Sequence, residues 1–375
     1  MFLFDKKSKS DFVPAIMLLV SMALLLATRL DESIITLTTY ALVLFAITCH
    51  IYIFRRLKNS ILYRRFMKLG LVLSLIYLFN MFVIGNMELK QVLIGTIVSS
   101  SIAILIFFFN IGKRYAILCF GIVLAVFIYR WFILNYDVEE ITVNSRNYIS
   151  YFLYLYSLPI VFCCYKKGTQ PSFIVPIIIL IMAIIAIGRG GIIMSLLFVI
   201  GWLLMKAKMT KHKILFYSIL VLVLLSFSSV VATPDFFDLY FSRFEERGLD
   251  SSIRTDGWLS YLNDITNPLY FITGYPLRHD RYIFSILEGS PHNSYINFHA
   301  RAGIFCLFIF FCIIKVMIAF LKQKNYLLLF FFLGLLIKGI TDADFPCTGV
   351  AGDIYIYILL LKYLESRINR NYKIS

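Results

Sequence analysis

Two arginines in this chain lie in local sequences that suit the binding of an anion. Arg189 lies between glycines in the run Gly188-Arg189-Gly190-Gly191, where open backbone N–H groups can add to the guanidinium. Arg254 follows Ser251 and Ser252 at a predicted helix start, where hydroxyls, free N–H groups and a cation together suit a phosphate. The alternatives are a snorkelling arginine in a tight hairpin and a solvated arginine on a loop.

His292, which Asn293 follows, is the third candidate for chemistry. A histidine can take a proton from a hydroxyl group near neutral pH. The alternative is a capping or surface residue at the start of a helix. His279 and His299 have no supporting neighbours in the sequence, so we predict no chemical role for them.

Nothing in the sequence predicts a metal or a cofactor. No His, Cys, Asp or Glu residues have the spacing of a metal site, and no P-loop, GxSxG or dinucleotide-binding fingerprint is present. Asp342-Ala343-Asp344 is a DxD sequence, but it falls in a predicted outer loop, where nucleotide sugars are absent. We expect Asp342 to pair with Lys338, one helical turn earlier. The cysteines lack CxxC spacing, and all but Cys347 lie in apolar stretches, which predicts small buried side chains.

The composition places these residues in a membrane protein. Hydrophobic residues make up 60% of the 375 positions and charged residues 15%, whereas soluble domains have about 25% charged residues. A bilayer core of roughly 30 Å needs about 20 apolar residues in a helix. The sequence therefore predicts an all-α polytopic fold, with residues 1–375 as a single membrane domain. About twelve membrane helices are expected, at 12–28, 34–54, 69–85, 91–110, 115–134, 148–165, 173–187, 190–205, 214–231, 302–320, 326–341 and 353–364.

The distribution of positive charge orients these helices. Most of the 36 lysines and arginines fall in alternate loops and in the C-terminal tail, while the short loops on the other side hold almost none. This pattern predicts that both termini are cytoplasmic. The net charge of +15 then reflects topology and contact with anionic lipid. It does not indicate nucleic-acid binding, because the basic residues are scattered over separate loops.

One long loop, residues 232–300, separates the ninth and tenth predicted membrane helices on the outer side. Its first part contains a helix start at Thr233-Pro234-Asp235, followed by an amphipathic helix over 236–247. A second helix is predicted to start at Asp250-Ser251-Ser252 and to end at Asn267-Pro268. Trp258, Leu259, Leu262 and Ile265 share one face of that helix, and Pro291-His292-Asn293 is expected to open the tenth membrane helix.

The order of these features resembles the bacterial O-antigen polymerase and O-antigen ligase superfamily. That pattern has an arginine in a short outer hairpin, then a large periplasmic loop with an arginine before an aromatic residue, an Asn-Pro…Gly turn and a His-Asn pair followed by a glycine. The matching residues, which lie between 188 and 306, are Gly188-Arg189-Gly190, Ile253-Arg254 with Trp258, Asn267-Pro268 with Gly274, and His292-Asn293 with Gly303.

The resemblance implies a metal-independent glycosyltransferase in the cell inner membrane that uses undecaprenyl-diphosphate-linked glycans at the periplasmic face. Arg189 and Arg254 would hold the diphosphate, with Arg247 as a further cation, and His292 would orient or deprotonate the acceptor hydroxyl. Trp258 would offer a stacking face, and Ser252 and Asn293 further polar contacts. The partners implied are the lipid-linked oligosaccharide, membrane lipid, a chain-length regulator and a flippase.

A polymerase and a ligase share this donor chemistry and differ in the acceptor. We favour a polymerase, because each glycan needs its own polymerase and because Cys306 replaces the small or β-branched residue of the ligase pattern. A capsule or exopolysaccharide polymerase fits equally. A transporter of lipid-linked glycans is the alternative from another class, although the predicted spans contain no internal repeat of the kind that transporters show.

Overall fold

The computed structural model describes residues 11–138, 140–142, 147–186, 188–209, 218, 251–277, 291–342, 346 and 352–374. It describes the backbone alone at residues 32, 147, 189, 209, 251–255, 341 and 370–374. Every regular element in these ranges is helical, which confirms the predicted all-α class for the described part of the chain.

The first half of the chain forms long helices, three of which contain a wide π-helical turn. In chain order the elements are α1 (Phe12–Ala27), the 3-10 turn η1 (Glu32–Ile34), α2 (Ile35–Leu57), α3 (Ile61–Phe79), the π-turn η2 (Asn80–Ile84), α4 (Leu89–Leu93), the π-turn η3 (Ile94–Val98), α5 (Ser99–Phe108), α6 (Lys113–Ile128) and the π-turn η4 (Tyr129–Ile133). Each π-turn continues a neighbouring α-helix without a break, so 61–84, 89–108 and 113–133 are single rods.

The second half contains long helices and a group of short ones. The described elements are α7 (Asn147–Lys167), α8 (Ile174–Ile185), α9 (Arg189–Met209), α12 (Ser251–Asp264), α13 (Pro268–Thr273), α15 (Ser294–Ala302), α16 (Phe305–Lys322), α17 (Tyr326–Thr341) and α18 (Asp353–Ile374). Asn267 caps α13, and Pro268 occupies its first turn. The predicted helix start at Ser251 is confirmed.

Seven described helical stretches are long and apolar enough to cross a membrane, and α1, α8 and α17 are shorter apolar helices. These stretches indicate a multi-pass membrane protein. Eleven of the twelve predicted spans coincide with helices, and the remaining one, at 214–231, lies outside the described residues except for residue 218. The helices often run past the apolar stretch, since α3 begins at Ile61 and α18 continues to Ile374.

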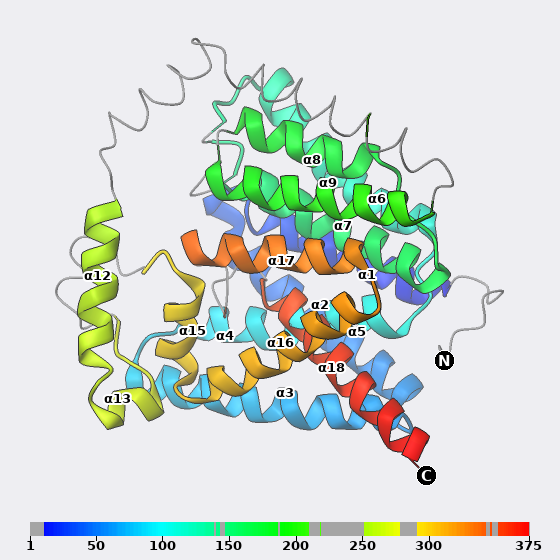
Figure 1. Ribbon diagram of the computed structural model, residues 1–375. Helices are drawn as coiled ribbons and strands as arrows, with labels where there is room; N and C mark the ends of the chain where they lie inside the picture. Colours follow the sequence, from blue (N-terminus) through cyan, green and yellow to red (C-terminus); the bar gives the residue numbers. More distant parts are fainter. Residues whose placement is uncertain are drawn as a thin grey trace.

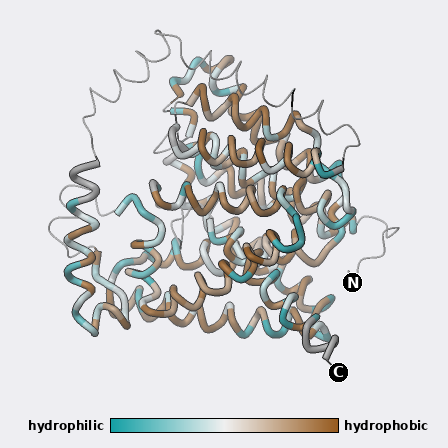
Figure 2. Tube along the Cα trace, in the orientation of Figure 1, coloured by the Kyte–Doolittle hydropathy of each residue, from teal (hydrophilic) through white to brown (hydrophobic). Residues whose placement is uncertain are grey.

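The long helices lie side by side with their axes in roughly one direction, and α12 crosses one end of the bundle (Figure 1). Figure 2 shows that the middle of these helices is mainly hydrophobic. Three of the described helices are largely enclosed by the others: α5 is buried from Ser101 to Phe107, α7 from Ser150 to Cys164, and α18 from Asp353 to Leu361. By contrast, α2, α3, α6 and α16 each expose a row of large apolar side chains on the surface of the bundle.

Two glycines set how closely α9 and α17 approach. These helices are antiparallel neighbours: a Cβ on Gly201 would overlap the Cβ of Phe330, and one on Gly334 would lie 2.9 Å from the Met194 carbonyl oxygen. Small residues allow membrane helices to pack this closely. Because the two helices are antiparallel, residues nearer the start of α9 lie beside residues nearer the end of α17. Met194 lies beside Gly334, so the backbone of Arg189, at the start of α9, is level with the last turn of α17.

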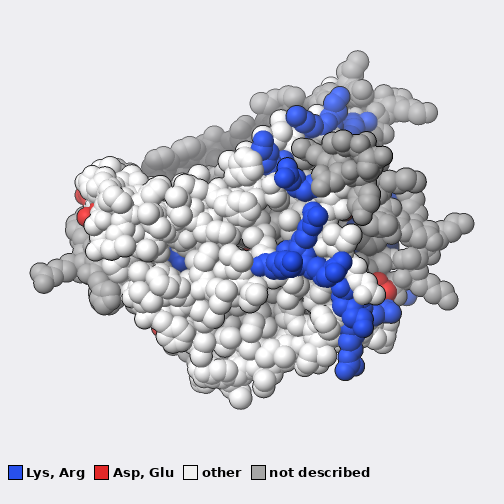
Figure 3. Space-filling model, turned by 90° about the horizontal axis from the view of Figure 1, so that it is seen from below, with Lys and Arg blue, Asp and Glu red and all other residues white. Residues whose placement is uncertain are grey.

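Most of the lysines and arginines that the structure describes lie at one end of the bundle, which we call the basic end. There Lys166 Nζ donates to the Phe109 carbonyl at 2.6 Å, Lys208 Nζ donates to that of Lys324 at 3.3 Å, and Lys362 Nζ lies 5.0 Å from the Tyr165 ring centre. Figure 3 shows basic side chains in a band near this end of the visible face. The C-terminal parts of α7, α9 and α18 lie at the basic end, since they carry Lys166, Lys208 and Lys362. The helices α7 and α9 therefore begin at the opposite end.

Two expectations about the long loop need correction. The segment after Pro291 does not open a membrane helix. It forms the separate short helix α15, which ends at Gly303 (φ +54°) before α16 begins. The packed face of α12 also differs from the predicted one, because Tyr261 is buried while Leu259 and Leu262 are about half exposed. Helical spacing groups apolar residues, but only the neighbouring segments decide which of them are covered.

Candidate active site

Two of the segments that carry predicted site residues contact each other at the end opposite the basic end. Trp258, on α12, donates its indole N–H to the Pro291 carbonyl at 2.8 Å, and His292 follows Pro291 directly. Arg254 is one helical turn before Trp258 on the same helix. This contact joins the helix that carries Arg254 to the turn that carries His292, although 38 positions separate the two residues in the chain.

His292 has an unusual backbone conformation. Its φ is +43°, in the left-handed region that residues other than glycine rarely adopt. Such a conformation costs of order 1–3 kcal/mol and persists where the surroundings require it, often at functional sites. Asn293 is the N-cap of α15, and its side-chain oxygen accepts hydrogen bonds from the Tyr295 and Ile296 N–H groups at 2.9 and 3.1 Å. The cap therefore belongs to Asn293, and this use occupies the side-chain oxygen of a residue that we expected to contact substrate.

A buried ion pair lies beside this segment. Lys338 Nζ contacts the Asp342 carboxylate at 2.8 Å, and only 1% of the lysine side chain is exposed. The expected pairing is confirmed. The ammonium also lies 5.0 Å from the ring centre of Tyr151 on α7. The Asp342 backbone carbonyl accepts a hydrogen bond from the Ser294 hydroxyl at 2.7 Å, which joins the end of α17 to the start of α15.

The turn that carries Arg189 begins α9 at the same end. A Cβ on Gly191 would overlap the side-chain oxygen of Ser150, so only a glycine lets this turn lie against α7. Ser150 precedes Tyr151, which in turn faces Lys338. Together with the register of α9 and α17, these contacts place the Arg189 backbone near the Lys338–Asp342 pair.

The described structure thus brings the backbones of the three predicted catalytic residues to one end of the bundle. The side chains of Arg189, Ser252 and Arg254, and the whole of Arg247, lie outside the described residues. Convergence of the two guanidiniums and the imidazole on one cavity remains a prediction.

Several polar residues of this region were missed by the sequence analysis. No sequence motif includes Ser150, Tyr151 or Ser294. Only their contacts in the structure place them in this region. Arg29 follows α1 at the same end, where the hydroxyl of Tyr148 is close enough to influence it. The Nε atom of Arg29 is buried and has no hydrogen-bond partner among the described residues. It is a further cation near the starts of α7 and α9.

Two glycines fasten α13 to α15 beside the site. Gly274 has φ +100° and Gly303 has φ +54°. A Cβ on Gly274 would overlap the Ala300 carbonyl oxygen, and one on Gly303 would overlap that of Ile272. The Asn86 amide donates to the Tyr275 and Ala300 carbonyls and ties the same contact to the bundle. Both motif glycines therefore have a structural role that the resemblance alone did not specify.

Replacement of Gly303 by alanine is expected to lower stability, because the new Cβ meets a backbone carbonyl and the positive φ disfavours a side chain. We expect the free energy of unfolding to fall by about 1–3 kcal/mol, as is usual for backbone strain of this kind. Thermal unfolding of the purified protein measures it. Gly121→Ala is the matched control, since nothing lies within 4 Å of a Cβ there. Equal melting temperatures for the two variants would contradict the proposed close contact.

His299, for which the sequence predicted no chemical role, has a clear structural one. Its Nε2 lies 2.9 Å from the Phe271 carbonyl oxygen, and its Nδ1 is hydrogen-bonded to the Tyr261 hydroxyl. Since a carbonyl can only accept, Nε2 carries the proton and Nδ1 accepts from Tyr261, as in a neutral imidazole. His299 therefore links α12, α13 and α15.

Burial lowers the pKa of His299 below its ordinary value, despite the opposing effect of the hydrogen bond to Phe271. The unfolded chain, with a histidine pKa of about 6.5, then binds the proton more readily than the folded one. Stability should fall as the pH drops below about 6.5. Melting temperatures at successive pH values between neutrality and acid test this. His299→Gln should have a smaller pH dependence, and an unchanged dependence would contradict the assignment.

No group of three or more His, Cys, Asp or Glu side chains among the described residues is arranged to hold a metal ion. The described side chains of this region include the cations Lys338 and Arg29, the hydroxyl groups of Ser150, Tyr151 and Ser294, and the strained His292. Comparison of the sequence with known protein families gives no match, and comparison with curated proteins gives none either.

Proposed function

We propose that this protein is a polysaccharide polymerase of the O-antigen type. It would transfer a growing glycan from undecaprenyl diphosphate to a lipid-linked repeat unit. The observation that carries the proposal is the position of three chain segments at one end of the bundle: the start of α9 with Arg189, the helix α12 with Arg254, and the strained turn at His292, which contacts α12 through Pro291 and Trp258. These are the segments that match the superfamily pattern.

The orientation follows from the basic end. Lysines and arginines favour the cytoplasmic side, so the site faces the periplasm and both termini are cytoplasmic. In this topology twelve helices cross the inner membrane, with nine before residues 232–300 and three after them. Lipid-linked glycan is displayed on the periplasmic side, which agrees with the position of the site.

The chemistry assigns a separate task to each part of the site. Departure of a diphosphate needs fixed positive charge in a poorly hydrated place. Arg189 and Arg254 bind its oxygens through paired N–H groups, and Arg29 and Arg247 add positive charge nearby. His292 takes the proton from the acceptor hydroxyl as that oxygen bonds to the anomeric carbon, and the bond from this carbon to the diphosphate breaks. Lys338 is neutralised by Asp342 at the end of α17, and the Asp342 carbonyl holds the start of α15 in place through Ser294.

A strain lacking this protein distinguishes the polymerase from its alternatives. Lipopolysaccharide that carries a single repeat on the core is the result expected for a polymerase. Bare core with accumulating lipid-linked polymer would identify a ligase, and lipid-linked repeats confined to the cytoplasmic leaflet would identify a transporter. Unchanged lipopolysaccharide and capsule would remove the proposal.

A further inference from the structure

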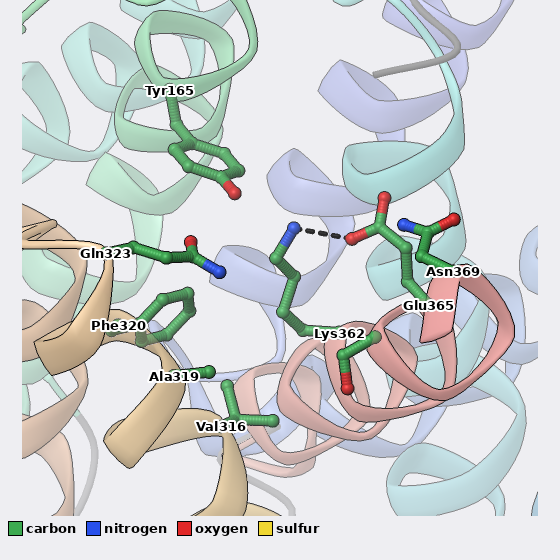
Figure 4. A pocket seen from close by; sticks show the side chains of 9 residues that line it. Tyr165, Val316, Ala319, Phe320, Gln323, Lys362, Glu365 and Asn369 are labelled. Atoms are coloured by element: carbon green, nitrogen blue, oxygen red, sulfur yellow. Dashed lines mark hydrogen bonds and ion pairs between the residues drawn. The ribbon is translucent and has the colours of Figure 1, made fainter. Parts of the chain in front are cut away.

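Arg29 follows α1 at the end opposite the basic end, and none of the described carboxylates forms an ion pair with it. Its side chain is largely buried, and its Nε atom has no hydrogen-bond partner among the described residues. Other largely buried cations do have a carboxylate. Lys338 pairs with Asp342. Lys362 pairs with Glu365 in a small pocket at the basic end (Figure 4). Because a buried charge is costly unless an opposite charge meets it, we expect a ligand to bring the anion to Arg29.

A second arginine adds positive charge beside this one. Arg130 Nη1 donates to the backbone carbonyl of Leu30, the residue after Arg29, at 2.6 Å. A carbonyl fixes the guanidinium without neutralising its charge. Asp31 is close enough to interact with Arg130, but its carboxylate is exposed and accepts hydrogen bonds from the N–H and hydroxyl of Ser33. The turn after α1 therefore carries two positive charges and one exposed negative charge.

Helix α7 separates this turn from the first turn of α9. Tyr148, Phe152 and Tyr156 form one stripe along α7, with neighbouring ring centres 6.2 and 6.1 Å apart. The stripe faces α1, since the Tyr156 hydroxyl donates to the Met22 carbonyl. Ser150 packs against the start of α9 instead. At 3.6 residues per turn, Ser150 and Tyr148 point to nearly opposite sides of α7. The end of the bundle thus has two separate places with arginines.

A reaction between two lipid-linked glycans needs two such places, an argument that rests on the proposed function. The donor loses its own diphosphate, so the donor phosphates lie at the reacting carbon. The acceptor reacts through a sugar hydroxyl, so its diphosphate lies on the far side of at least one sugar ring. The two diphosphates also repel each other. Positive charge is therefore required at a second position, away from the reacting atoms.

We propose that Arg29, with Arg130 beside it, binds the diphosphate of the acceptor, the lipid-linked repeat unit. The planar guanidinium of Arg29 can donate to two phosphate oxygens at once. No bond to this diphosphate forms or breaks, so Arg29 acts in binding alone. The phosphate of an ordinary phospholipid has the same chemistry, and the experiments below distinguish the two sources.

A polymerisation assay on the purified full-length protein tests the assignment. The donor is labelled, and its acceptor hydroxyl is blocked, so that label enters product only by transfer. Two acceptors are compared: the repeat unit on a polyprenyl diphosphate, and the same repeat unit on an alkyl chain without phosphate. Arg29→Met should raise KM for the diphosphate acceptor roughly tenfold, the effect of one charge-assisted contact. The KM for the phosphate-free acceptor and kcat should stay nearly unchanged.

Two further variants support the comparison. Arg29→Lys keeps the charge but loses the paired N–H groups, and should raise this KM less than Arg29→Met. Arg65→Met removes an exposed arginine at the basic end and should raise it not at all. An unchanged KM for the diphosphate acceptor in Arg29→Met, or an equal increase for both acceptors, would overturn the proposal. If the unchanged protein formed no labelled product, the proposed function itself would be wrong, and this inference with it.

Binding and stability give readouts that do not depend on turnover. Native mass spectrometry with a short polyprenyl diphosphate should detect two bound copies on the unchanged protein and one on Arg29→Met. Phosphatidylglycerol is supplied in equal amount, and its retention at the site that Arg29→Met loses would overturn the proposal in favour of a phospholipid. The melting temperature of Arg29→Met should not fall, because the variant removes a buried charge that has no partner. A lower melting temperature with two copies still bound would show that Arg29 only stabilises the C-terminal end of α1.

Discussion

Conservative replacement of either site arginine, Arg189→Lys or Arg254→Lys, should sharply reduce polymerisation without loss of folded protein. Lysine keeps the positive charge but loses the planar pair of N–H groups that binds two phosphate oxygens at once. Loss of one charge-assisted hydrogen bond corresponds to a decrease of roughly tenfold to a hundredfold. Turnover of purified protein with lipid-linked repeat units measures the effect.

The His292→Ala variant should differ from the two arginine variants. The histidine acts on the acceptor, so binding of the diphosphate donor should remain nearly unchanged while transfer slows about 10²–10⁴-fold. Alanine keeps a Cβ and is disfavoured at this left-handed φ as histidine is, so the slower transfer would reflect the missing base. Binding of a labelled lipid-linked donor, measured beside turnover, separates the two effects.

Arg64→Lys is the matched control for these variants, because Arg64 is exposed at the basic end. A surface change of this kind alters stability by no more than about 0.5 kcal/mol, and polymerisation should be unaffected. If Arg189→Lys, Arg254→Lys and His292→Ala all retained the turnover of the unchanged protein, the proposed mechanism would be wrong. The membrane topology would be unaffected by that result.

The Asp342→Asn variant should be the most destabilising single change in the region. It leaves the ammonium of Lys338, which is 1% exposed, without its carboxylate. Removal of one partner from a buried ion pair costs about 3–5 kcal/mol. The double variant Lys338→Met, Asp342→Asn should recover much of this loss, since no buried charge is then left over. Melting temperatures of Asp342→Asn, Lys338→Met and the double variant give the coupling energy between the two side chains.

An exposed pair serves as the control for this cycle. Lys90 and Glu88 are 2.9 Å apart, but their side chains are 55% and 43% exposed. Surface pairs of this kind contribute about 0–1 kcal/mol, so Glu88→Gln should change the melting temperature little. Comparable losses from Glu88→Gln and Asp342→Asn would show that burial of Lys338 does not matter for stability.

The membrane helices were largely predictable, and their ends were less so. The apolar run at 69–85 marked only part of a helix that starts at Ile61. Hydropathy detects the part of a helix that is apolar, whereas the backbone hydrogen bonds continue through Arg64, Arg65 and Lys68, which are good helix formers. The π-turn at Ile94–Val98 had no signal in the sequence. There the side chains of Thr96 and Ser99 donate to carbonyls of their own helix, as is common in many regular helices.

The candidate site was predictable only in its local parts. Capping by Asn267 and Asn293 follows from side chains that bond to the next N–H groups, and pairing of Lys338 with Asp342 follows from one turn of helix. The contact of Trp258 with Pro291 and the approach of Tyr151 to Lys338 join segments far apart in the chain. No local pattern encodes such contacts, because they depend on how whole helices pack.

The sequence by itself determined which stretches are helical and which end of the bundle carries positive charge, since both depend on short runs of residues. Only the tertiary structure decided which helices are enclosed. Within Tyr148–Lys167 on α7, 89% of the apolar 18-residue window is buried, against 28% of the window within Lys113–Ile133, although the latter has the higher mean hydropathy, 2.3 against 1.4. Lipid tails and a protein interior are about equally apolar, so hydropathy cannot tell a helix that faces lipid from one that faces other helices. That choice is made by close contacts such as those of Gly201, Gly334 and Gly191, which exist only after the helices have packed.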